Sequence, residues 1–351
     1  MSSHATGAHP ASHDTSADTA PPFPREAVSS LPPVAGPRPP AVRVFEGRLD
    51  PRSPWQPTAA QRAGVERTLR SVGRIQQDDL TLGTGFLVAP TIVMTNRHVA
   101  ESFCTDVDGT LKIRIGWTPT IDFIAERLPS EVGPSAPPDA PDPPHHDHAH
   151  HPAPGGTHAS GNGHAERADA PAALRRARFA VSSVLYTHDV LDLALLRVTL
   201  DPDKAVSPLP ADWVTPAPLR LGVTRPDPLP TAIYLVGFPF NDPTAGDDEL
   251  NDVFGHVFDV KRVQPGTRNR LDEARKELGH TASTLRGNSG SCVVDLDTHE
   301  VVALHYQGSR EEQGKPARNL AVALWLLDEE TRAAMKATGV DVGPDGGSSA
   351  S

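Results

Sequence analysis

The chain has 351 residues and a formal net charge of -11 at pH 7. Binding to DNA or RNA depends on Lys and Arg side chains that neutralise phosphates, so this acidic balance argues against a nucleic-acid partner. No stretch approaches the roughly 18 apolar residues of a membrane-spanning helix, and we expect no membrane association. Residues 1–20 also lack the apolar core of a secretory signal, which predicts a cytoplasmic protein.

The chain contains two cysteines, Cys104 and Cys292. Small secreted domains often depend on several disulfides, so this low count favours a reducing compartment. A single bridge between the two cysteines stays open as an alternative, because bridge formation depends on distances that the sequence does not give.

The first part of the chain changes composition near residue 56. Residues 1–55 are rich in Pro, Ala and Ser without apolar periodicity, which predicts a disordered arm. Residues 56–78 then carry apolar side chains at helical spacing, namely Val65, Leu69, Val72 and Ile75. This spacing predicts one short amphipathic helix that packs on the core.

Residues 79–328 are rich in short segments of branched side chains bounded by Gly, Pro or Asp, which predict β-strands. The first group comprises Thr81–Val88, Ile92–Thr95, Leu111–Trp117, Phe179–Tyr186 and Leu193–Val198. The second group comprises Ala232–Gly237, Val253–Val263, Thr281–Leu285, Ser291–Leu296, Val301–Tyr306 and Leu320–Leu324. Such grouping predicts an all-β fold of two packed antiparallel six-stranded barrels. We expect a closing helix over Trp325–Ala337, so that residues 329–351 form its end and a flexible tail.

A long Pro-, His- and Ala-rich stretch, residues 129–172, interrupts the first group of strands. Unstructured loops of this length are uncommon inside compact domains, so we predict an exposed disordered insertion. Its histidines offer imidazoles to a transition metal such as Zn or Ni: His145, His146, His148, His150, His151, His158 and His164. Flexible His-rich tracts bind metal weakly, and we therefore favour a solvated spacer and expect no metal site.

The sequence GNSGS at residues 287–291 suits a nucleophilic serine. A serine hydroxyl attacks a carbonyl carbon only beside a base, and the resulting oxyanion needs two backbone N–H donors. Glycines around Ser289 let the backbone turn so that the N–H groups of Gly287 and Ser289 converge. By itself, the motif is explained equally well by a glycine turn.

His98 ends an apolar strand–turn–strand segment, GTGFLVAPTIVMTNRHVA at residues 83–100. A solitary histidine there is more often structural, but together with the serine motif it predicts a general base. The base needs a shielded carboxylate that orients the imidazole, and Asp192 lies between two leucines at the head of an apolar strand. Burying that charge is costly unless it is paired. The rival, Asp189, lies in a more polar turn, where a solvated acid is expected.

The order His98, Asp192, Ser289 and the segments GTGFLVAP, TNRHVA, LDLALL, GNSGS and VVALHYQG resemble the chymotrypsin and trypsin family. The segments are similar to bacterial trypsin-like peptidases, including glutamyl endopeptidases, and the resemblance spans residues 81–327. It implies two barrels with the site in the cleft between them. It also implies a serine endopeptidase that hydrolyses protein or peptide substrates through an acyl-enzyme and needs no cofactor.

The chain departs from the family pattern at two positions beside the motif. Cys292 follows it where many relatives have proline, and Arg286 precedes Gly287 where glycine is frequent. The resemblance also places a specificity pocket next to Thr284 and His305, which match positions that contact an acidic side chain in glutamyl endopeptidases. A preference for cleavage after Glu and a merely structural packing of His305 are both open at this point.

Two further alternatives concern activity itself. The same fold could serve as a catalytically silent peptide-binding module with a vestigial triad. It could also be an effector that an unknown partner, or a cleavage in the arm, activates. The intact triad and both oxyanion glycines favour an active enzyme. The physiological substrate and the oligomeric state do not follow from the sequence.

Overall fold

The computed structural model describes residues 39–126, 175–222, 229–242, 249–309 and 318–343. The predicted insertion at 129–172, with its seven histidines, and the first 38 residues of the predicted arm lie outside the described residues. Within the described part, no helix is long and apolar enough to cross a membrane. Cys104 and Cys292 are both free and buried, so the disulfide that the sequence left open is not formed.

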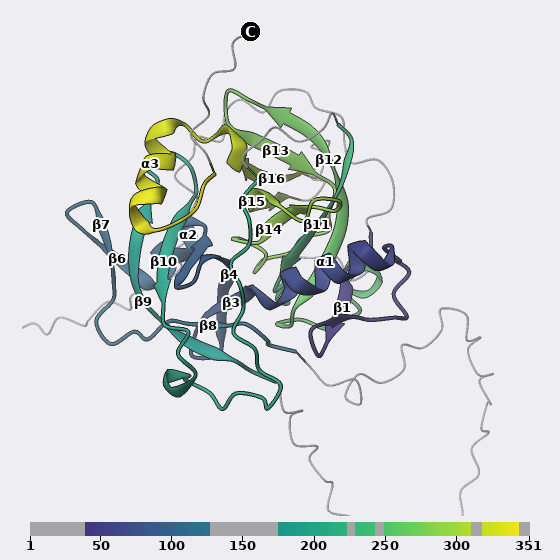
Figure 1. Ribbon diagram of the computed structural model, residues 1–351, viewed down its shortest axis with the longest axis horizontal. Helices are drawn as coiled ribbons and strands as arrows, with labels where there is room; N and C mark the ends of the chain where they lie inside the picture. Colours follow the sequence, from purple (N-terminus) through teal and green to yellow (C-terminus); the bar gives the residue numbers. More distant parts are fainter. Residues whose placement is uncertain (1–38, 127–174, 223–228, 243–248, 310–317, 344–351) are drawn as a thin grey trace, which may run out of the picture. The chain divides into compact units, whose positions relative to one another are not determined.

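The first barrel is a closed ring of antiparallel strands in the order β10-β5-β4-β3-β8-β9 (Figure 1). Its members are β3 (Val72–Gln77), β4 (Leu80–Ala89), β5 (Ile92–Thr95), β8 (Thr120–Asp122), β9 (Arg178–Thr187) and β10 (Ala194–Val198). Branched and aromatic side chains fill the interior, among them Ile75, Leu87, Val93 and Phe179. Burial of these side chains supplies the main driving force for closing the ring.

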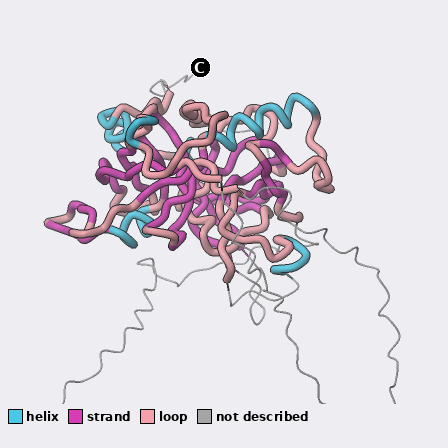
Figure 2. Tube along the Cα trace, turned by 90° about the horizontal axis from the view of Figure 1, so that it is seen from below, coloured by secondary structure: helices cyan, strands magenta, loops and turns pink. Residues whose placement is uncertain are grey.

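The second barrel has the order β11-β14-β15-β16-β13-β12, and a β11–β12 pairing closes it. Its members are β11 (Thr231–Gly237), β12 (Arg262–Asp272), β13 (Glu277–His280), β14 (Cys292–Asp295), β15 (Val301–Ser309) and β16 (Arg318–Ala323). The two six-stranded antiparallel barrels confirm the predicted fold class. Figure 2 shows the strands gathered in the interior, with the helices around them.

Two short strands lie in the stretch that the composition predicts to be disordered. Strand β1 (Val42–Phe45) pairs with β12, and β2 (Arg48–Leu49) pairs with β1. Val42, Val44 and Leu49 are 3–4% exposed and belong to the main hydrophobic cluster. The prediction of disorder up to residue 55 was therefore wrong for this segment, because the free edge of β12 orders it.

The predicted helix over residues 56–78 is shorter than the spacing suggested. Helix α1 (Ala59–Arg70) begins at a capping box between Thr58 and Gln61 and ends at Arg70. Val72 and Ile75, taken as helical, belong to β3, the first strand of the barrel, which therefore starts before residue 79. Gly73 disfavours a helix, and pairing of β3 with β4 and β8 outweighs the helical spacing.

Three other predicted strands differ from the strands that the structure contains. In the segment Leu111–Trp117, only β7 (Thr110–Ile113) forms, in a hairpin with β6 (Cys104–Val107), and β8 takes the place in the barrel. Most of Val253–Val263 is not a strand: Val253 ends a helical turn, residues 254–261 form turns and loop, and β12 begins only at Arg262. The segment Thr281–Leu285 is an irregular loop after β13.

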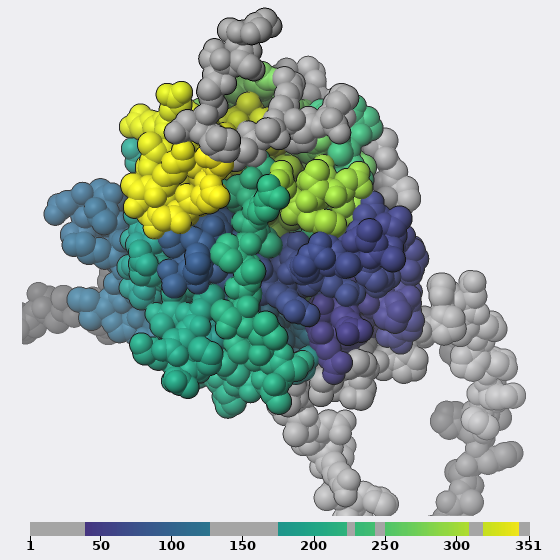
Figure 3. Space-filling view, viewed as in Figure 1, coloured from purple at the N-terminus to yellow at the C-terminus, as the bar shows by residue number. Residues whose placement is uncertain are grey.

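The C-terminal helix starts later than predicted. Helix α3 (Glu329–Thr338) is capped by Asp328 and ends at Gly339, whose φ of 102° lies in the left-handed region. It lies against β9 at the surface (Figure 3), where Tyr186 hydrogen-bonds to Thr331. Val340 and Val342 are 2% exposed and pack in the main cluster, so the predicted flexible tail was wrong for these residues.

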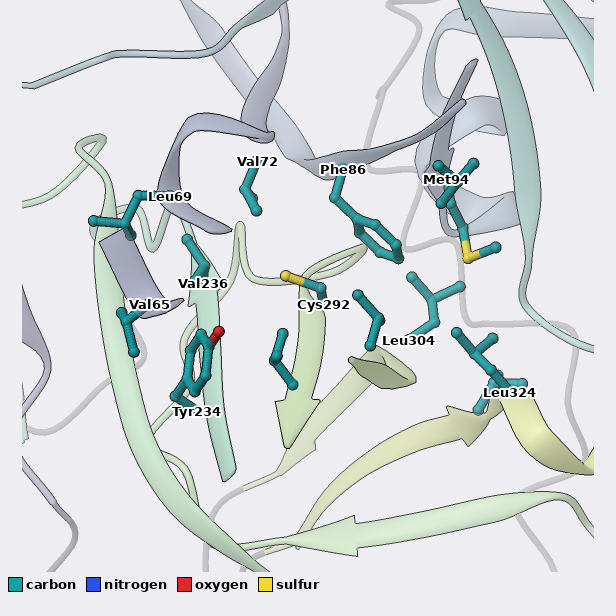
Figure 4. Packing of buried hydrophobic residues seen from close by; sticks show 14 of the residues in the cluster. Val65, Leu69, Val72, Phe86, Met94, Tyr234, Val236, Cys292, Leu304 and Leu324 are labelled. Carbon is teal, nitrogen blue, oxygen red and sulfur yellow. The ribbon is translucent and has the colours of Figure 1, made fainter. Parts of the chain in front are cut away.

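The largest hydrophobic cluster joins the two barrels and helix α1. Figure 4 shows Phe86 and Met94 of the first barrel facing Cys292 and Leu304 of the second. Val65 and Leu69 of α1 pack beside Tyr234 in the same view. The barrels are thus held by a shared core, which fixes the side chains at their junction.

A buried lysine lies within this junction. Nζ of Lys261 donates to the backbone oxygens of Leu69, at 2.5 Å, and Phe123, at 2.6 Å. These oxygens belong to α1 and to the segment after β8, so the ammonium group ties both to the second barrel. Burial lowers the pKa of Lys261 to about 8, although Glu126 and Asp122 act to raise it.

This lysine predicts a pH dependence of stability. Between about pH 8 and 10.5 the unfolded chain holds a proton on Lys261 that the folded chain has released, so the free energy of unfolding should rise with pH by up to about 3 kcal/mol. The test is urea unfolding of wild type and Lys261→Met between about pH 8 and 10.5, with the difference in their free energies of unfolding plotted against pH. The exposed Lys112→Met is the control, and it should keep the wild-type slope. Parallel curves for Lys261→Met and wild type would contradict the assignment.

Candidate active site

His98 lies where strand β5 is followed by a short helix. Helix α2 (Arg97–Phe103) follows β5 directly, with Asn96 at its N-terminal cap, and His98 is its second residue. The Asn96 side chain donates to the backbone oxygen of Asp192 at 2.8 Å. The end of β5 is thereby fastened to the segment that carries the acid.

The carboxylate of Asp192 binds His98 through two hydrogen bonds. Oδ2 lies 2.6 Å from Nδ1 of the ring, and Oδ1 accepts the backbone N–H of His98 at 3.0 Å. An ionised carboxylate only accepts hydrogen bonds, so Nδ1 carries the proton and Nε2 is left as the basic nitrogen. The Asp192 side chain is 7% exposed and that of His98 is 41% exposed. The acid is therefore shielded while the imidazole reaches the surface.

Asp189 is exposed and makes no side-chain contact with His98 among the contacts of the described residues. The sequence had singled out Asp192 because leucines flank it, and the structure buries that residue instead. The leucines on either side of Asp192 are thus accompanied by burial of its carboxylate.

The loop of Ser289 has a backbone that only glycine tolerates at two points. Gly287 has a φ of 91°, and a Cβ there would lie 2.3 Å from the backbone oxygen of Phe238. Gly290 has a φ of 86°, and its Cβ would lie 2.0 Å from the backbone oxygen of Thr84. Both a left-handed conformation and close backbone contact thus require these glycines.

Strand β4 of the first barrel holds this loop of the second barrel. Thr84 donates its hydroxyl to the oxygen of Gly287 at 2.7 Å and its N–H to the oxygen of Ser289 at 2.8 Å. A Cβ on Gly83 would lie 2.7 Å from Val99 and 3.0 Å from the oxygen of Ser289. Gly83 therefore lies between Ser289 and Val99, the residue after His98. The segment that carries His98 and the loop that carries Ser289 thus lie next to each other.

Two backbone N–H groups in the Ser289 loop, those of Gly287 and of Ser289 itself, differ from their neighbours in their hydrogen bonding. The N–H groups of Asn288, Gly290 and Ser291 donate to the oxygens of Leu285, His305 and Asn288, respectively. For the part of the chain that the structure describes, the N–H groups of Gly287 and Ser289 have no such protein acceptor. An arrangement of unpaired donors around a half-buried hydroxyl can bind a developing oxyanion.

Gly290→Ala is expected to destabilise the protein by about 2 kcal/mol or more, through backbone strain and the contact with Thr84. Gly47→Ala is the matched control, since Gly47 has a φ of 70° but no atom within 4 Å of its Cβ position. Urea unfolding measures both. Equal losses in the two variants would show that close approach of Gly290 to Thr84 contributes nothing.

His305, which the sequence placed in a specificity pocket, is 2% exposed and pairs with a second buried histidine. Its Nδ1 lies 3.1 Å from Nε2 of His280, and the ring also hydrogen-bonds to the backbone of Leu320. Burial lowers the pKa of His280 to about 3 and that of His305 well below its ordinary value. Sequence reasoning missed His280, because nothing local marks a partner that lies 25 residues away across β13 and β15.

Thr284 and Arg286 lie on the segment that leads to Ser289. Thr284 is buried and donates to the side chain of Asn319, another residue that the sequence did not single out. Arg286 is exposed and forms an ion pair with the buried Asp242 at 3.6 Å, while its backbone oxygen accepts the N–H of Phe240. The departure from the family pattern at Arg286 thus lies on the surface and leaves the backbone before Gly287 held in place.

The described residues contain no group of three or more His, Cys, Asp or Glu side chains placed to hold a metal ion. The chemistry that the arrangement offers is that of a serine hydroxyl, a histidine with a free Nε2, a shielded carboxylate and two backbone donors.

The model for the trypsin-like peptidase domain matches residues 83–304 of the chain. A probable serine protease of Lysobacter enzymogenes is 25% identical over 310 residues, which cover 77% of this chain and 67% of that protein. Among solved structures, an inactive form of Rv3671c from M. tuberculosis has a TM-score of 0.41 at 14% identity, over 81% of this chain and 94% of that chain. Neuropsin, a serine protease expressed in the limbic system of mouse brain, has a TM-score of 0.44 at 11% identity, over 77% and 96%.

Proposed function

Because this chain belongs to the trypsin-like peptidase family and is a serine-type peptidase, we propose that it cleaves internal peptide bonds with Ser289 as nucleophile, His98 as general base and Asp192 as the acid that orients it. The observation that carries the assignment is the double contact of Asp192 with His98, at 2.6 and 3.0 Å.

In the first half of the reaction, Nε2 of His98 takes the proton of the Ser289 hydroxyl as Oγ bonds to the substrate carbonyl carbon. The buried carboxylate of Asp192 stabilises the imidazolium that results. His98 then returns the proton to the leaving amine as the C–N bond breaks. The products are an acyl-enzyme on Ser289 and a free amino terminus.

In the second half, His98 takes a proton from water while the water oxygen attacks the acyl carbon, and Ser289 leaves with that proton. Both halves pass through a tetrahedral oxyanion. The N–H groups of Gly287 and Ser289 are proposed to bind it, since they are the donors beside the nucleophile without a protein acceptor among the described residues. These steps use groups of this chain and a protein or peptide substrate.

Thr284 and His305 are proposed to line the subsite for the substrate side chain that precedes the cleaved bond. Thr284 precedes Ser289 by five residues, and the backbone oxygen of His305 accepts the N–H of Gly290, next to the nucleophile. Both residues are thus connected directly to the loop that presents the hydroxyl.

The test is incubation of the purified full-length chain with a quenched peptide library, with products identified by mass spectrometry. We expect cleavage at defined internal bonds. If peptides bind, as fluorescence polarisation would show, but no bond is cleaved at equal molar amounts of protein and peptide, the chain is a catalytically silent binding module. Cleavage that arises only on removal of residues 1–38 would indicate control by the arm.

A further inference from the structure

The loop between β9 and β10, residues 188–193, presents the carboxylate of Asp192 to His98. The N–H of His188 donates to the backbone oxygen of Leu193 at 3.0 Å, and the N–H of Leu193 donates to that of Leu191 at 2.8 Å. Asp192 lies within this loop, and its side chain makes both contacts with His98. The position of the carboxylate therefore depends on the path of the residues just before it.

A second histidine, His188, holds that path from within the loop. Its ring nitrogen Nδ1 lies 3.0 Å from the backbone nitrogen of Val190 and 2.9 Å from that of Leu191. A backbone N–H only donates hydrogen bonds, so Nδ1 must accept both and carries no proton. His188 is therefore neutral in this arrangement, with its proton on Nε2, which is the opposite tautomer from that of His98.

Protonation of His188 is incompatible with these two hydrogen bonds. A charged imidazole carries a proton on each ring nitrogen, so Nδ1–H would face the two N–H donors at 3.0 and 2.9 Å. The ring would turn away, and the N–H groups of Val190 and Leu191 would lose this acceptor. The charge of His188 and the conformation of the loop thus exclude each other.

Charged groups of both signs surround the ring of His188. Burial lowers the pKa of His188, Asp328 and Asp189 act to raise it, and Lys276 and Arg97 act to lower it. Lys276 lies in the turn between β12 and β13, Arg97 on α2, Asp328 at the N-terminal cap of α3 and Asp189 in the loop itself. The net shift is downward, so the surroundings favour the neutral ring that the loop requires.

Two of the neighbouring groups keep their charge state in weakly acidic solution. Tyr186 on β9 meets the ring of His188 edge-on, with 6.5 Å between ring centroids, and burial raises the pKa of its hydroxyl. Hydrogen bonds from Thr331 lower the pKa of Asp328 to about 2. Tyr186 therefore stays neutral and Asp328 stays ionised while His188 takes up its proton.

Arg97, the residue before His98, fastens the same loop to α2. Its Nη1 donates to the backbone oxygens of His188 at 3.0 Å and Asp189 at 3.3 Å. The first half of the loop is thus held by Arg97, and the second half, which leads into Asp192, is held by Nδ1 of His188. Loss of the two bonds to Nδ1 would free the residues next to Asp192 and leave the start of the loop attached.

We propose that His188 is a positioning residue: its neutral Nδ1 fixes the loop that presents Asp192, and its protonation releases Asp192 from His98 and slows peptide hydrolysis at acid pH. The proposal rests on the proposed peptidase function and its triad. His188 acts on the reaction through Asp192, so it is not itself a catalytic residue. Two histidines of opposite tautomer then determine how the rate depends on pH.

The first test compares wild type with His188→Asn. Oδ1 of asparagine is bonded to Cγ, as Nδ1 of histidine is, so it places an uncharged acceptor at the same point. At about pH 7.5 the two proteins should have kcat values within about twofold of each other. As the pH is lowered to about 4.5, the ratio of wild-type to variant kcat/KM should fall by about fivefold or more, because only wild type loses its loop contacts. Titration of His98 and of the peptide is common to both proteins and cancels in the ratio.

A second variant separates hydrogen bonding from packing. His188→Phe keeps a ring but removes the acceptor, so kcat at about pH 7.5 should fall by between about ten- and a hundredfold with KM nearly unchanged. A role of His188 in packing alone would instead spare His188→Phe and impair His188→Asn. The control His256→Asn removes an exposed histidine that precedes β12, and its ratio to wild type should stay constant with pH.

A ratio of wild type to His188→Asn that stays constant between about pH 7.5 and 4.5 overturns the inference and leaves the peptidase function standing. So does a His188→Asn variant that is slower than His188→Phe at the upper pH. The pH ratio does not depend on the folding of His188→Phe. If wild type cleaves no member of a peptide library at any pH in this range, the proposed function itself fails. The two failures are therefore distinct.

Discussion

Ser289→Ala is expected to lower kcat for peptide hydrolysis by on the order of a million-fold. The hydroxyl is the atom that bonds to the substrate in the proposed reaction, and no neighbouring group takes its place. The backbone donors at Gly287 and at position 289 persist in the variant, so a small residual rate above the uncatalysed reaction should survive. Short assays measure the wild-type rate, and long incubations with product detection measure the residual rate of the variant.

Ser291→Ala is the matched control for the nucleophile. Ser291 is two residues away, is buried, and its Oγ has no hydrogen-bond partner among the described residues. Its removal should leave kcat within a few-fold of wild type. If Ser289→Ala kept more than about one thousandth of the wild-type rate, or if Ser291→Ala were the more damaging change, Ser289 would not be the nucleophile.

Asp192→Asn is expected to lower kcat by about 10⁴-fold at neutral pH. The amide cannot accept from His98 with both atoms, so the ring is driven to the tautomer that carries its proton on Nε2. That tautomer cannot take the proton of Ser289. The bond from Asn96 to the backbone oxygen of residue 192 is unaffected, so the loop should keep its position.

The control for this change is Asp189→Asn, which makes the same chemical replacement three residues away on an exposed side chain. Initial rates with one peptide should show a large loss for Asp192→Asn and less than about a twofold change for Asp189→Asn. A comparable loss in both variants would mean that the general charge near His98, and not a specific contact, supports the reaction.

The sequence predicted the parts of the structure that local patterns determine. The strands at Ile92–Thr95 and around Phe179–Tyr186 alternate or cluster branched residues strongly, and both are found in the first barrel. The burial of Asp192 followed from its leucine neighbours. The turn of Ser289 followed from its glycines, since their positive φ angles are a local requirement.

Other parts depend on contacts that no local pattern displays. Val72 and Ile75 fit a helical period, yet pairing with β4 and β8 places them in a strand. Strand β8 has only three residues and shows no periodic pattern in the sequence. The segment that contains β7 was therefore predicted as the barrel strand in its place. β1 is ordered by pairing with β12, and the paired residues Arg43 and Arg262 lie 219 positions apart in the sequence.

The surroundings of Thr284 and His305 were likewise only partly visible in the sequence. Thr284 and His305 were found through their resemblance to a family pattern. Their partners, Asn319 and His280, are brought to them by the closing of the second barrel. Those two contacts join residues that are 35 and 25 positions apart, so they could be identified only in the folded chain.

The most direct test of the central claim is covalent labelling with a fluorophosphonate, which reacts with a serine hydroxyl activated by a neighbouring base. The account predicts a single adduct on Ser289 of the full-length protein, loss of peptide hydrolysis in proportion to labelling, and much slower labelling of Asp192→Asn. The account would be contradicted if the protein still hydrolysed peptides after prolonged exposure to the reagent and Ser289 were unmodified. An adduct on another residue that abolished activity would also contradict it.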